Sequence, residues 1–251
     1  MTLKEIILGY GPVLVALSGG VDSMTLLAAC VKYGADVSAA TIISELTPPD
    51  DVIRAERFTE AVGIEWIPVQ IPLLTNEGIK ANPVNRCYLC KKIIMTRMLE
   101  TAGGRTVFDG THADDMNEER PGRKVLEELG IISPFALAGI GKAGIYDLAK
   151  EFGVPIVPPS SCLATRIPFG EELTLEKLEK VSNAELFLRK RGISGILRVR
   201  LQGNGAVVET EKNEMSCAES YRDDLKGIGF TTIAFTEYRC GGMGSWNKKE
   251  Q

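Results

Sequence analysis

The chain has 251 residues, of which 44% are hydrophobic, 29 are Lys or Arg and 33 are Asp or Glu. This size and composition predict one large or two moderate globular domains, and the formal net charge of −4 disfavours nucleic acid as a general partner. No apolar run approaches the roughly 20 residues that span a bilayer, and the N-terminal segment lacks the pattern of a signal peptide, so we expect a soluble, cytoplasmic protein with no membrane partner.

The first part of the chain alternates short apolar runs with amphipathic segments. Strands are expected at residues 13–17, 36–43, 64–69 and 106–108. Helices are expected at residues 1–10, 24–31, 51–62, from the segment 82–92 to about 102, at 124–129 and at 142–152. Strands that alternate with helices predict an α/β fold with a doubly wound parallel sheet. Residues 72–85 show no periodicity, and we interpret them as a mobile loop near the site.

A smaller α+β domain is expected to follow. Pro155, Pro158 and Pro159 exclude a helix, and we place the domain boundary between residues 1–168 and residues 169–251. The second domain should contain a helix at 173–190, a hairpin of strands 196–201 and 206–209, a helix at 215–226 and a strand at 231–235. The first of these helices should bury an apolar face made of Leu175, Leu178, Val181, Leu186 and Phe187.

A glycine-rich turn, Ser18-Gly19-Gly20-Val21-Asp22-Ser23, joins the first strand to the next helix. Glycines let an anion approach the backbone N–H groups, and the helix N-terminus adds its positive dipole end. Asp22 either caps the helix or holds a metal ion. The turn has no lysine, and it resembles the SGGxDS loop of the PP-loop ATP pyrophosphatases. That resemblance implies ATP cleaved between its α- and β-phosphates, with nucleotide contacts from Ala16, Ser18, Gly19, Gly20, Val21, Asp22 and Ser23. The alternative is an ordinary turn with a serine cap.

Two further segments end at the edge of the sheet where parallel sheets bind ligands. Asp109-Gly110-Thr111-His112-Ala113-Asp114-Asp115 follows the strand 106–108, and it resembles the GTHxxD stretch of many PP-loop enzymes. Gly110 would approach phosphate and Asp114 would hold Mg²⁺, a hard ion that prefers oxygen ligands. The alternative for Asp114 and Asp115 is that they cap a helix. Ser44, after the strand 36–43, would meet adenine or ribose.

Three of the six cysteines have a suggestive placement. Cys87 and Cys90 open a helix, and Cys162 lies in the next long loop. Three thiolates can hold a [4Fe–4S] cluster with one open iron, or zinc with a fourth ligand. A redox dithiol and three unrelated thiols remain as alternatives. Cys30 lies on an apolar stretch and is expected in the core, and Cys217 and Cys240 are expected to be structural. His112 is the only histidine, which nearly excludes a Ser-His-Asp triad and a multi-histidine metal site.

The segments NRCYLCK, DGTHADDxNxxRPG and CLATRIPFG, together with the loop, occur in this order over almost the whole chain. In this combination the sequence resembles the LarE family of ATP-dependent sulfur transferases. The family adenylates a carboxylate of a pyridinium dicarboxylate mononucleotide and converts it to a thiocarboxylate, in the synthesis of the nickel-pincer nucleotide cofactor. The resemblance implies ATP, Mg²⁺, a nucleotide substrate, a sulfur donor and a homo-oligomer such as a hexamer.

The resemblance also implies roles for individual residues. Some members sacrifice the sulfur of a cysteine at the position of Cys162, and others are thought to use a [4Fe–4S] cluster. The presence of Cys87 and Cys90 beside Cys162 favours the cluster. Catalytic roles fall to Cys162, Asp22 and Lys91, the last as a point charge on phosphate or else on a solvated helix face.

An anionic substrate calls for bidentate arginines. The candidates are Arg120, Arg123, Arg166, Arg198 and Arg200. Arg198 and Arg200 share one face of a strand because strand side chains alternate with a period of two, although that face can also be merely exposed. Thr165 and Glu209 are added by the resemblance alone.

Three other functions compete with this one. A tRNA 2-thiolation enzyme would need a basic surface, which the acidic chain disfavours. An amidating PP-loop enzyme would not need three cysteines near its site. A nucleotide sensor would bind ATP without releasing pyrophosphate.

Overall fold

The computed structural model describes residues 1–117 and 121–239, with side chains except those of 116, 117 and 121–123. The chain divides into two compact units. Unit 1 comprises residues 1–71 and 87–157, and unit 2 comprises residues 72–86 and 158 onward. The boundary predicted at residues 168/169 lies further along the chain than this division, which also gives unit 2 an early segment.

Unit 1 is built on a parallel sheet of four strands in the order β3-β2-β1-β4. Their bounds are β1 Val13–Ala16, β2 Val37–Ile43, β3 Trp66–Gln70 and β4 Thr106–Phe108. A single parallel bridge from Phe108 to Ile132 continues the sheet beyond β4. The α/β class predicted from the sequence is confirmed, and the central strand β1 carries its C-terminal end into the glycine-rich turn.

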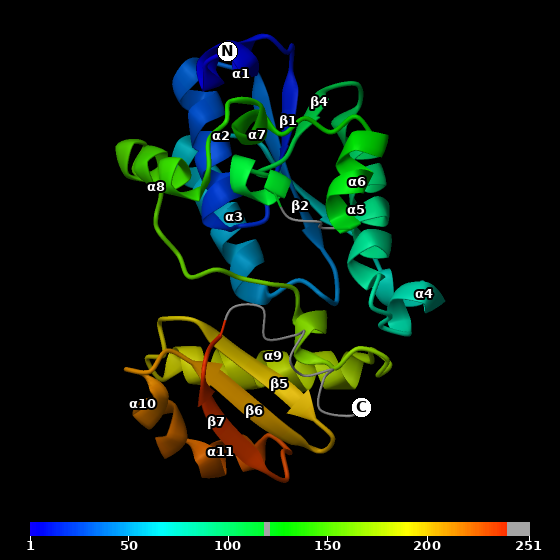
Figure 1. Ribbon diagram of the computed structural model, residues 1–251, viewed down its shortest axis with the longest axis vertical. Coiled ribbons are helices and arrows are strands. Elements are labelled where there is room, and N and C mark those ends of the chain that lie inside the picture. The colour runs from blue at the N-terminus through cyan, green and yellow to red at the C-terminus, as the bar shows by residue number, and fades with distance from the viewer. Residues whose placement is uncertain (118–120, 240–251) are drawn as a thin grey trace. The chain divides into compact units, whose positions relative to one another are not determined.

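Helices cover both faces of this sheet (Figure 1). They are α1 Leu3–Leu8, α2 Val21–Tyr33, α3 Pro49–Val62, α5 Arg86–Ala102, α6 Pro121–Glu128, α7 Pro134–Leu137 and α8 Lys142–Glu151. Successive residues of β1 belong to different cores, because strand side chains alternate between faces. Val13 and Val15 pack with α2 and α8, whereas Leu14 packs with Met95 and Met98 of α5. The sheet is therefore doubly wound.

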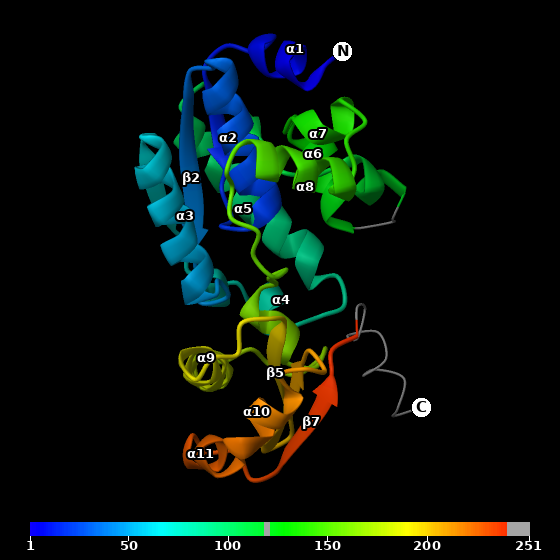
Figure 2. The same ribbon diagram turned by 90° about the vertical axis from the view of Figure 1, so that its left-hand side faces the viewer.

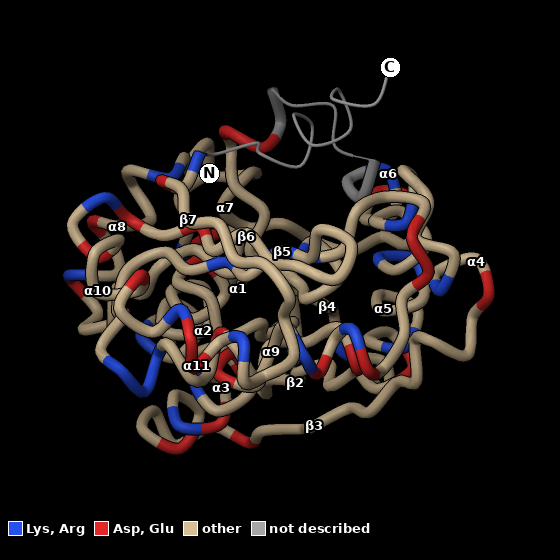
Figure 3. The backbone as a smooth tube through the Cα atoms, turned by 90° about the horizontal axis from the view of Figure 1, so that it is seen from below, with Lys and Arg blue, Asp and Glu red and all other residues tan. Residues whose placement is uncertain are grey.

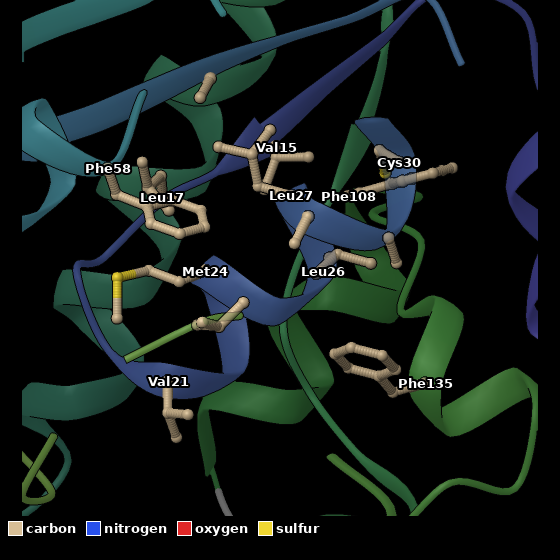
Figure 4. Packing of buried hydrophobic residues seen from close by; sticks show 14 of the residues in the cluster. Val15, Leu17, Val21, Met24, Leu26, Leu27, Cys30, Phe58, Phe108 and Phe135 are labelled. Atoms are coloured by element: carbon tan, nitrogen blue, oxygen red, sulfur yellow. The ribbon is translucent and has the colours of Figure 1, made fainter. Parts of the chain in front are cut away.

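Helix α2 is the most deeply buried helix of unit 1, and nine of its residues, from Val21 to Cys30, lie in the core. Its side chains Leu26, Leu27 and Cys30 belong to the same cluster as Val15 and Phe108 (Figure 4). Burying an aliphatic side chain contributes about 1.5–3 kcal/mol, so this cluster fixes the helix on the sheet. The N-terminus of α2, which follows the glycine-rich turn, is fixed with it.

Unit 2 contains a mixed sheet of three strands, in the order β5-β6-β7. β5 Leu197–Gln202 and β6 Gly205–Thr210 form the predicted antiparallel hairpin, and β7 Ile233–Glu237 pairs with β6 in parallel. Figure 2 shows α9 Leu175–Lys190 beside β5, and α10 Met215–Ser220 and α11 Arg222–Gly227 precede β7. The single helix predicted at 215–226 is wrong, because the helix is interrupted at Tyr221.

Two other details differ from the sequence analysis. The segment expected to be a mobile loop contains the short helices η1 Leu73–Thr75 and α4 Glu77–Lys80, and it belongs to unit 2. Its irregular composition hid two helical turns that are too short to show a period. Leu175, expected on the apolar face of α9, is 51% exposed because it lies in the first turn of that helix.

Charges of both signs occur along the same helices, as blue and red segments on α8 and α11 show (Figure 3). On α8, Lys142 and Lys150 accompany Asp147 and Glu151. In the described part of the chain, no helix is long and apolar enough to cross a membrane.

Cys30 should be chemically inert in the folded protein. It is fully buried, and desolvation raises the pKa of its thiol to about 12, so at pH 8 only about one molecule in 10⁴ would carry the thiolate that reacts. We expect iodoacetamide to modify the exposed Cys217 and to spare Cys30 until the chain is unfolded, as measured by peptide mass spectrometry. Equal labelling of both cysteines in the folded protein would contradict this burial.

Candidate nucleotide site and cysteine segment

The turn between β1 and α2 depends on a left-handed glycine. Gly19 has φ of +75°, and a Cβ added there would overlap the backbone carbonyl oxygen of Asp51 at the start of α3. From the same helix, the Arg54 guanidinium donates to the Gly19 carbonyl oxygen at 3.0 Å and pairs with Asp51. The first turn of α3 therefore fixes the loop, and only glycine fits at this position.

The two serines of the loop bond to each other. The hydroxyl groups of Ser18 and Ser23 lie 3.1 Å apart, and Ser23 Oγ also accepts the Ser18 N–H and donates to the Gly20 carbonyl. Gly20 is the N-cap of α2, and no side chain caps this helix. The proposed alternative of an ordinary serine cap is therefore wrong, and the first N–H groups of a 13-residue helix face the turn.

The end of β4 packs against the start of α2. A Cβ added at Gly110 would lie 3.1 Å from the Ser23 nitrogen and 3.4 Å from the Asp22 Cβ. The preceding residue, Asp109, is a buried carboxylate that accepts from the hydroxyls of Thr111 at 2.7 Å and Ser133 at 2.6 Å. Gly110 is thus held beside the loop, and its contact with phosphate stays a prediction.

Lys91 joins this group from α5. Its Nζ lies 3.4 Å from Asp109 Oδ2, and the side chain is 31% exposed. The partner of Lys91 is thus Asp109. This residue begins the predicted phosphate segment 109–115, but it was not predicted as a site residue. Its signal was a carboxylate directly after an apolar strand, which is the position where a parallel sheet presents side chains to a ligand.

Asp22 and Asp114 both contact Lys142, which was not predicted from the sequence. Lys142 Nζ, on the first residue of α8, lies 2.6 and 2.8 Å from the two carboxylate oxygens of Asp22. The Lys142 backbone N–H donates to Asp114 Oδ2 at 2.6 Å, so Asp114 caps α8 from another segment. His112 lies between Asp114 and Asp115, with its ring nitrogens 3.9 and 3.4 Å from their oxygens. Lys142 carried no motif, and only the tertiary fold brings it to Asp22.

Ser44 stands at the end of β2 as expected, and its hydroxyl takes part in a local turn. Ser44 Oγ accepts the Leu46 N–H at 3.2 Å and lies 3.0 Å from the Thr47 hydroxyl. Such turns are common at serine and threonine. Contact with adenine or ribose stays a prediction.

In unit 2, the segment with Cys162 is fixed by a buried arginine. Cys162 is half-buried and precedes the short helix η3 Leu163–Arg166. The Arg166 side chain is 1% exposed, with Nε and Nη2 donating to the two oxygens of Glu185 at 2.7 and 3.0 Å. Its Nη1 donates to the hydroxyls of Ser161 and Thr165, each at 2.7 Å. Arg166 and Thr165 thus shape the cysteine segment, and Glu185 is a partner that the sequence did not reveal.

Arg198 and Arg200 are both buried on β5, so the exposed-face alternative is wrong. Arg200 Nε donates to Glu209 Oε2 at 2.8 Å, and its Nη1 donates to the Thr165 carbonyl at 2.5 Å. Arg198 has carbonyl partners, Leu197 at 2.7 Å and Pro159 at 2.5 Å, and forms no ion pair among the described residues. Desolvation, followed by the positive charge of Arg166, lowers the pKa of the Arg198 guanidinium to about 10.

The remaining candidates are placed only in part. Cys87 is exposed and Cys90 is half-buried; both belong to the unit 1 part of α5, whereas Cys162 belongs to unit 2. Among the described residues, no group of three His, Cys, Asp or Glu side chains could hold a metal ion. Arg120 lies outside the described residues, as does the side chain of Arg123.

Comparison with known proteins identifies the family. No protein-family model matches the chain. It is 37% identical to an uncharacterised protein of Synechocystis over 78% of this chain and 75% of that protein. It is 30% identical to the pyridinium-3,5-bisthiocarboxylic acid mononucleotide synthase of Lactiplantibacillus plantarum, over 95% of this chain and 91% of the synthase. The chain belongs to the LarE family.

A solved structure supports the fold of this LarE-family chain. The NMN synthetase of Francisella tularensis superposes with a TM-score of 0.50 and 19% identity, over 63% of this chain and 74% of the synthetase. At this identity the likeness shows only that the two share an α/β fold. The functional residues of the LarE-family chain must be argued from its own geometry.

Replacing Gly19 should disrupt the loop more than its backbone angle alone predicts. We expect Gly19→Ala to lose ATP binding in calorimetry, because the added Cβ would displace Asp51. Gly34→Ala is the matched control, since Gly34 has φ of +79° but nothing within 4 Å of its added Cβ. That variant should cost about 1 kcal/mol of stability and retain binding. Equal effects of the two variants would show that the contact with α3 does not shape the site.

Proposed function

We propose that this chain is an ATP-dependent sulfur transferase that adenylates a carboxylate of a pyridinium dicarboxylate mononucleotide and inserts sulfur to form a thiocarboxylate. The uncapped N-terminus of α2, held open by the left-handed Gly19, carries the proposal. Helix N-termini of this kind bind phosphate through backbone N–H groups and the helix dipole. Membership of the LarE family supports the choice of reaction and of substrate.

ATP and Mg²⁺ fit the residues at this site. The loop offers backbone N–H groups, and Gly20 within it and Gly110 beside it add no side chain at these positions. Asp22 and Asp114 offer carboxylate oxygens to Mg²⁺, which usually takes one or two protein carboxylates and completes its shell with phosphate oxygens and water. Contacts from Ala16, Ser18, Val21 and Ser23 follow from the same placement.

Adenylation needs a substrate carboxylate oxygen to attack the α-phosphorus while the bond to pyrophosphate breaks. The electron pair of that bond leaves with pyrophosphate, so positive charge beside it lowers the barrier. The ammonium groups of Lys91 and Lys142 provide point charges at this edge of the sheet. Asp109 and Asp22 hold these two ammonium groups in place.

The sulfur step is proposed at Cys162. In the sacrificial route, the Cys162 thiolate displaces AMP from the acyl adenylate and forms a thioester. Loss of the proton on Cα and cleavage of the Cβ–Sγ bond then yield the thiocarboxylate and leave dehydroalanine. In the route that the sequence favours, Cys87, Cys90 and Cys162 would have to come together as ligands, because they form no metal-holding group in the described structure. A [4Fe–4S] cluster held by them would carry sulfide from a donor on its open iron.

Arg198 is the strongest candidate for binding the anionic substrate. Its buried guanidinium lacks a carboxylate partner among the described residues, and its pKa is lowered, so a phosphate or carboxylate beside it would offset the cost of desolvation. Arg166 and Arg200 are already paired with Glu185 and Glu209 and shape the segment around it. Roles for Arg120 and Arg123, and assembly as a homo-oligomer, are proposed from the family resemblance.

Asp22→Asn should abolish adenylation without unfolding the protein. Its carboxylate is 31% exposed and pairs with Lys142, so the amide should be tolerated while Mg²⁺–ATP loses a ligand. We expect substrate-dependent pyrophosphate release to fall by about 100-fold or more. Asp147→Asn, an exposed carboxylate on α8, is the control and should keep full activity. Unchanged release in Asp22→Asn would remove this residue from the site.

Iron analysis decides between the two sulfur routes. Protein purified without oxygen should be brown and contain iron and sulfide if the cluster forms, and Cys87→Ala should lose both. The mass of Cys162 should then be unchanged after turnover. Colourless protein in which Cys162 loses the elements of hydrogen sulfide would contradict the cluster and support the sacrificial route.

A further inference from the structure

The segment with Cys162 is held by a second segment of unit 2, residues 80–86, whose backbone is strained. Asn82 has φ of +52° and is the only non-glycine residue with positive φ in the part of the chain that the structure describes. It is fully buried and precedes Pro83. A residue before proline favours extended backbone, so this conformation persists only if the surroundings impose it.

The contacts of Asn82 are those surroundings. Its carbonyl oxygen accepts the Gly170 N–H at 2.9 Å. Its Nδ2 donates to the Pro168 carbonyl at 2.7 Å and lies 3.4 Å from the Ile167 carbonyl. Its Oδ1 accepts from the Arg86 guanidinium. Backbone and side chain of Asn82 thus hold three residues of the segment 167–170, namely Ile167, Pro168 and Gly170.

Arg86 extends the same contact toward the cysteine. Its fully buried guanidinium donates from Nη1 to the Ala164 carbonyl at 3.2 Å, two residues after Cys162. The guanidinium also lies over the Phe169 ring, 5.4 Å from its centre. Arg86 is the first residue of α5, and Cys87 follows by one peptide bond. The Arg86 side chain therefore joins the residue that precedes Cys87 to the segment that contains Cys162.

The cysteine segment is also held through Arg166, which pairs with Glu185 of α9. Residues 162–166 thus have partners in two other segments of unit 2. A thiol that must attack an acyl group needs a defined position, because a displacement of about 1 Å can cost on the order of 100-fold in rate.

We propose that Asn82 and Arg86 are positioning residues, which fix Cys162 for sulfur transfer by clamping residues 164–170. The proposal rests on the proposed function for the reaction that Cys162 serves. The clamp itself is defined without substrate, because every contact in it lies within the chain. A clamp of this kind explains why asparagine stands at a position where glycine would be unstrained. Glycine would adopt the same φ angle, but it would form none of the side-chain hydrogen bonds.

Asn82→Gly tests the clamp with little risk to folding, since it keeps the backbone angle and removes the side-chain bonds. We expect iodoacetamide to modify the half-buried Cys162 several-fold faster, and the Gly170 amide to exchange its hydrogen faster. The rate constant of sulfur transfer in a single turnover should fall by about 10- to 100-fold, while the KM for ATP in pyrophosphate release stays unchanged. Arg86→Lys keeps the charge but loses the planar stacking on Phe169, and it should show a smaller change in the same direction.

Lys80→Ala is the matched control. Lys80 and Glu172 join the same two segments at the surface with an ion pair of 2.9 Å, between a 33% and a 56% exposed side chain. This variant should leave alkylation, exchange and the single-turnover rate constant unchanged, because exposed ion pairs contribute little.

Unchanged alkylation of Cys162 and unchanged exchange at Gly170 in folded Asn82→Gly would overturn the clamp. Faster alkylation with undiminished sulfur transfer would overturn its positioning role. If the wild-type chain transfers no sulfur, the proposed function fails, and the positioning role fails with it even where alkylation responds. Alkylation and exchange need neither ATP nor substrate, so the two failures are distinguishable.

Discussion

Burial of α2 against the sheet is the interaction on which the proposed nucleotide site depends. Nine of the ten residues from Val21 to Cys30 are buried, most of them apolar, and a helix of this kind is stable only inside a core. Its depth leaves the N-terminus no freedom to tilt away from β1. The geometry of the turn, where we propose that phosphate binds, is therefore a product of hydrophobic packing more than of the turn residues. Gly19 is the exception, because a larger residue there would overlap Asp51 of α3.

Unit 2 differs from unit 1 because it buries several charged side chains in and around a small mixed sheet. Removing an ion from water costs several kcal/mol unless good partners replace the water. Arg166 and Arg200 have carboxylate partners with bonds of 2.7 to 3.0 Å. Arg198 has carbonyl partners, and desolvation together with the positive charge of Arg166 lowers the pKa of its guanidinium. An excess of buried positive charge lowers the stability of a domain, and such an arrangement is typical of sites that bind an anion.

The sequence predicted elements that carry strong local signals and missed pairs that only the fold creates. Strand-turn-helix at residues 13–33 was evident because an apolar run, glycines and a long apolar helix coincide. The partnership of Asp22 with Lys142 spans 120 residues and has no local signature. Asp109 and Glu185 are similar: each is one carboxylate among many until the backbone places a lysine or an arginine beside it. The break at Tyr221 and the turns within residues 72–86 are shorter than any period that a pattern can reveal.

The division of the chain has a consequence for how the protein is made. Unit 2 is discontinuous, and the bond from Arg86 to Ala164 joins residues 78 positions apart, with β4 and the helices from α5 to α8 of unit 1 encoded between them. At roughly 5–20 residues per second of synthesis, residues 80–86 leave the ribosome about 4–16 s before their partners. During that interval Arg86 and Asn82 are without their final partners, so unit 2 must complete its folding late. A fragment that begins at residue 158 would lack residues 72–86, which belong to the same unit.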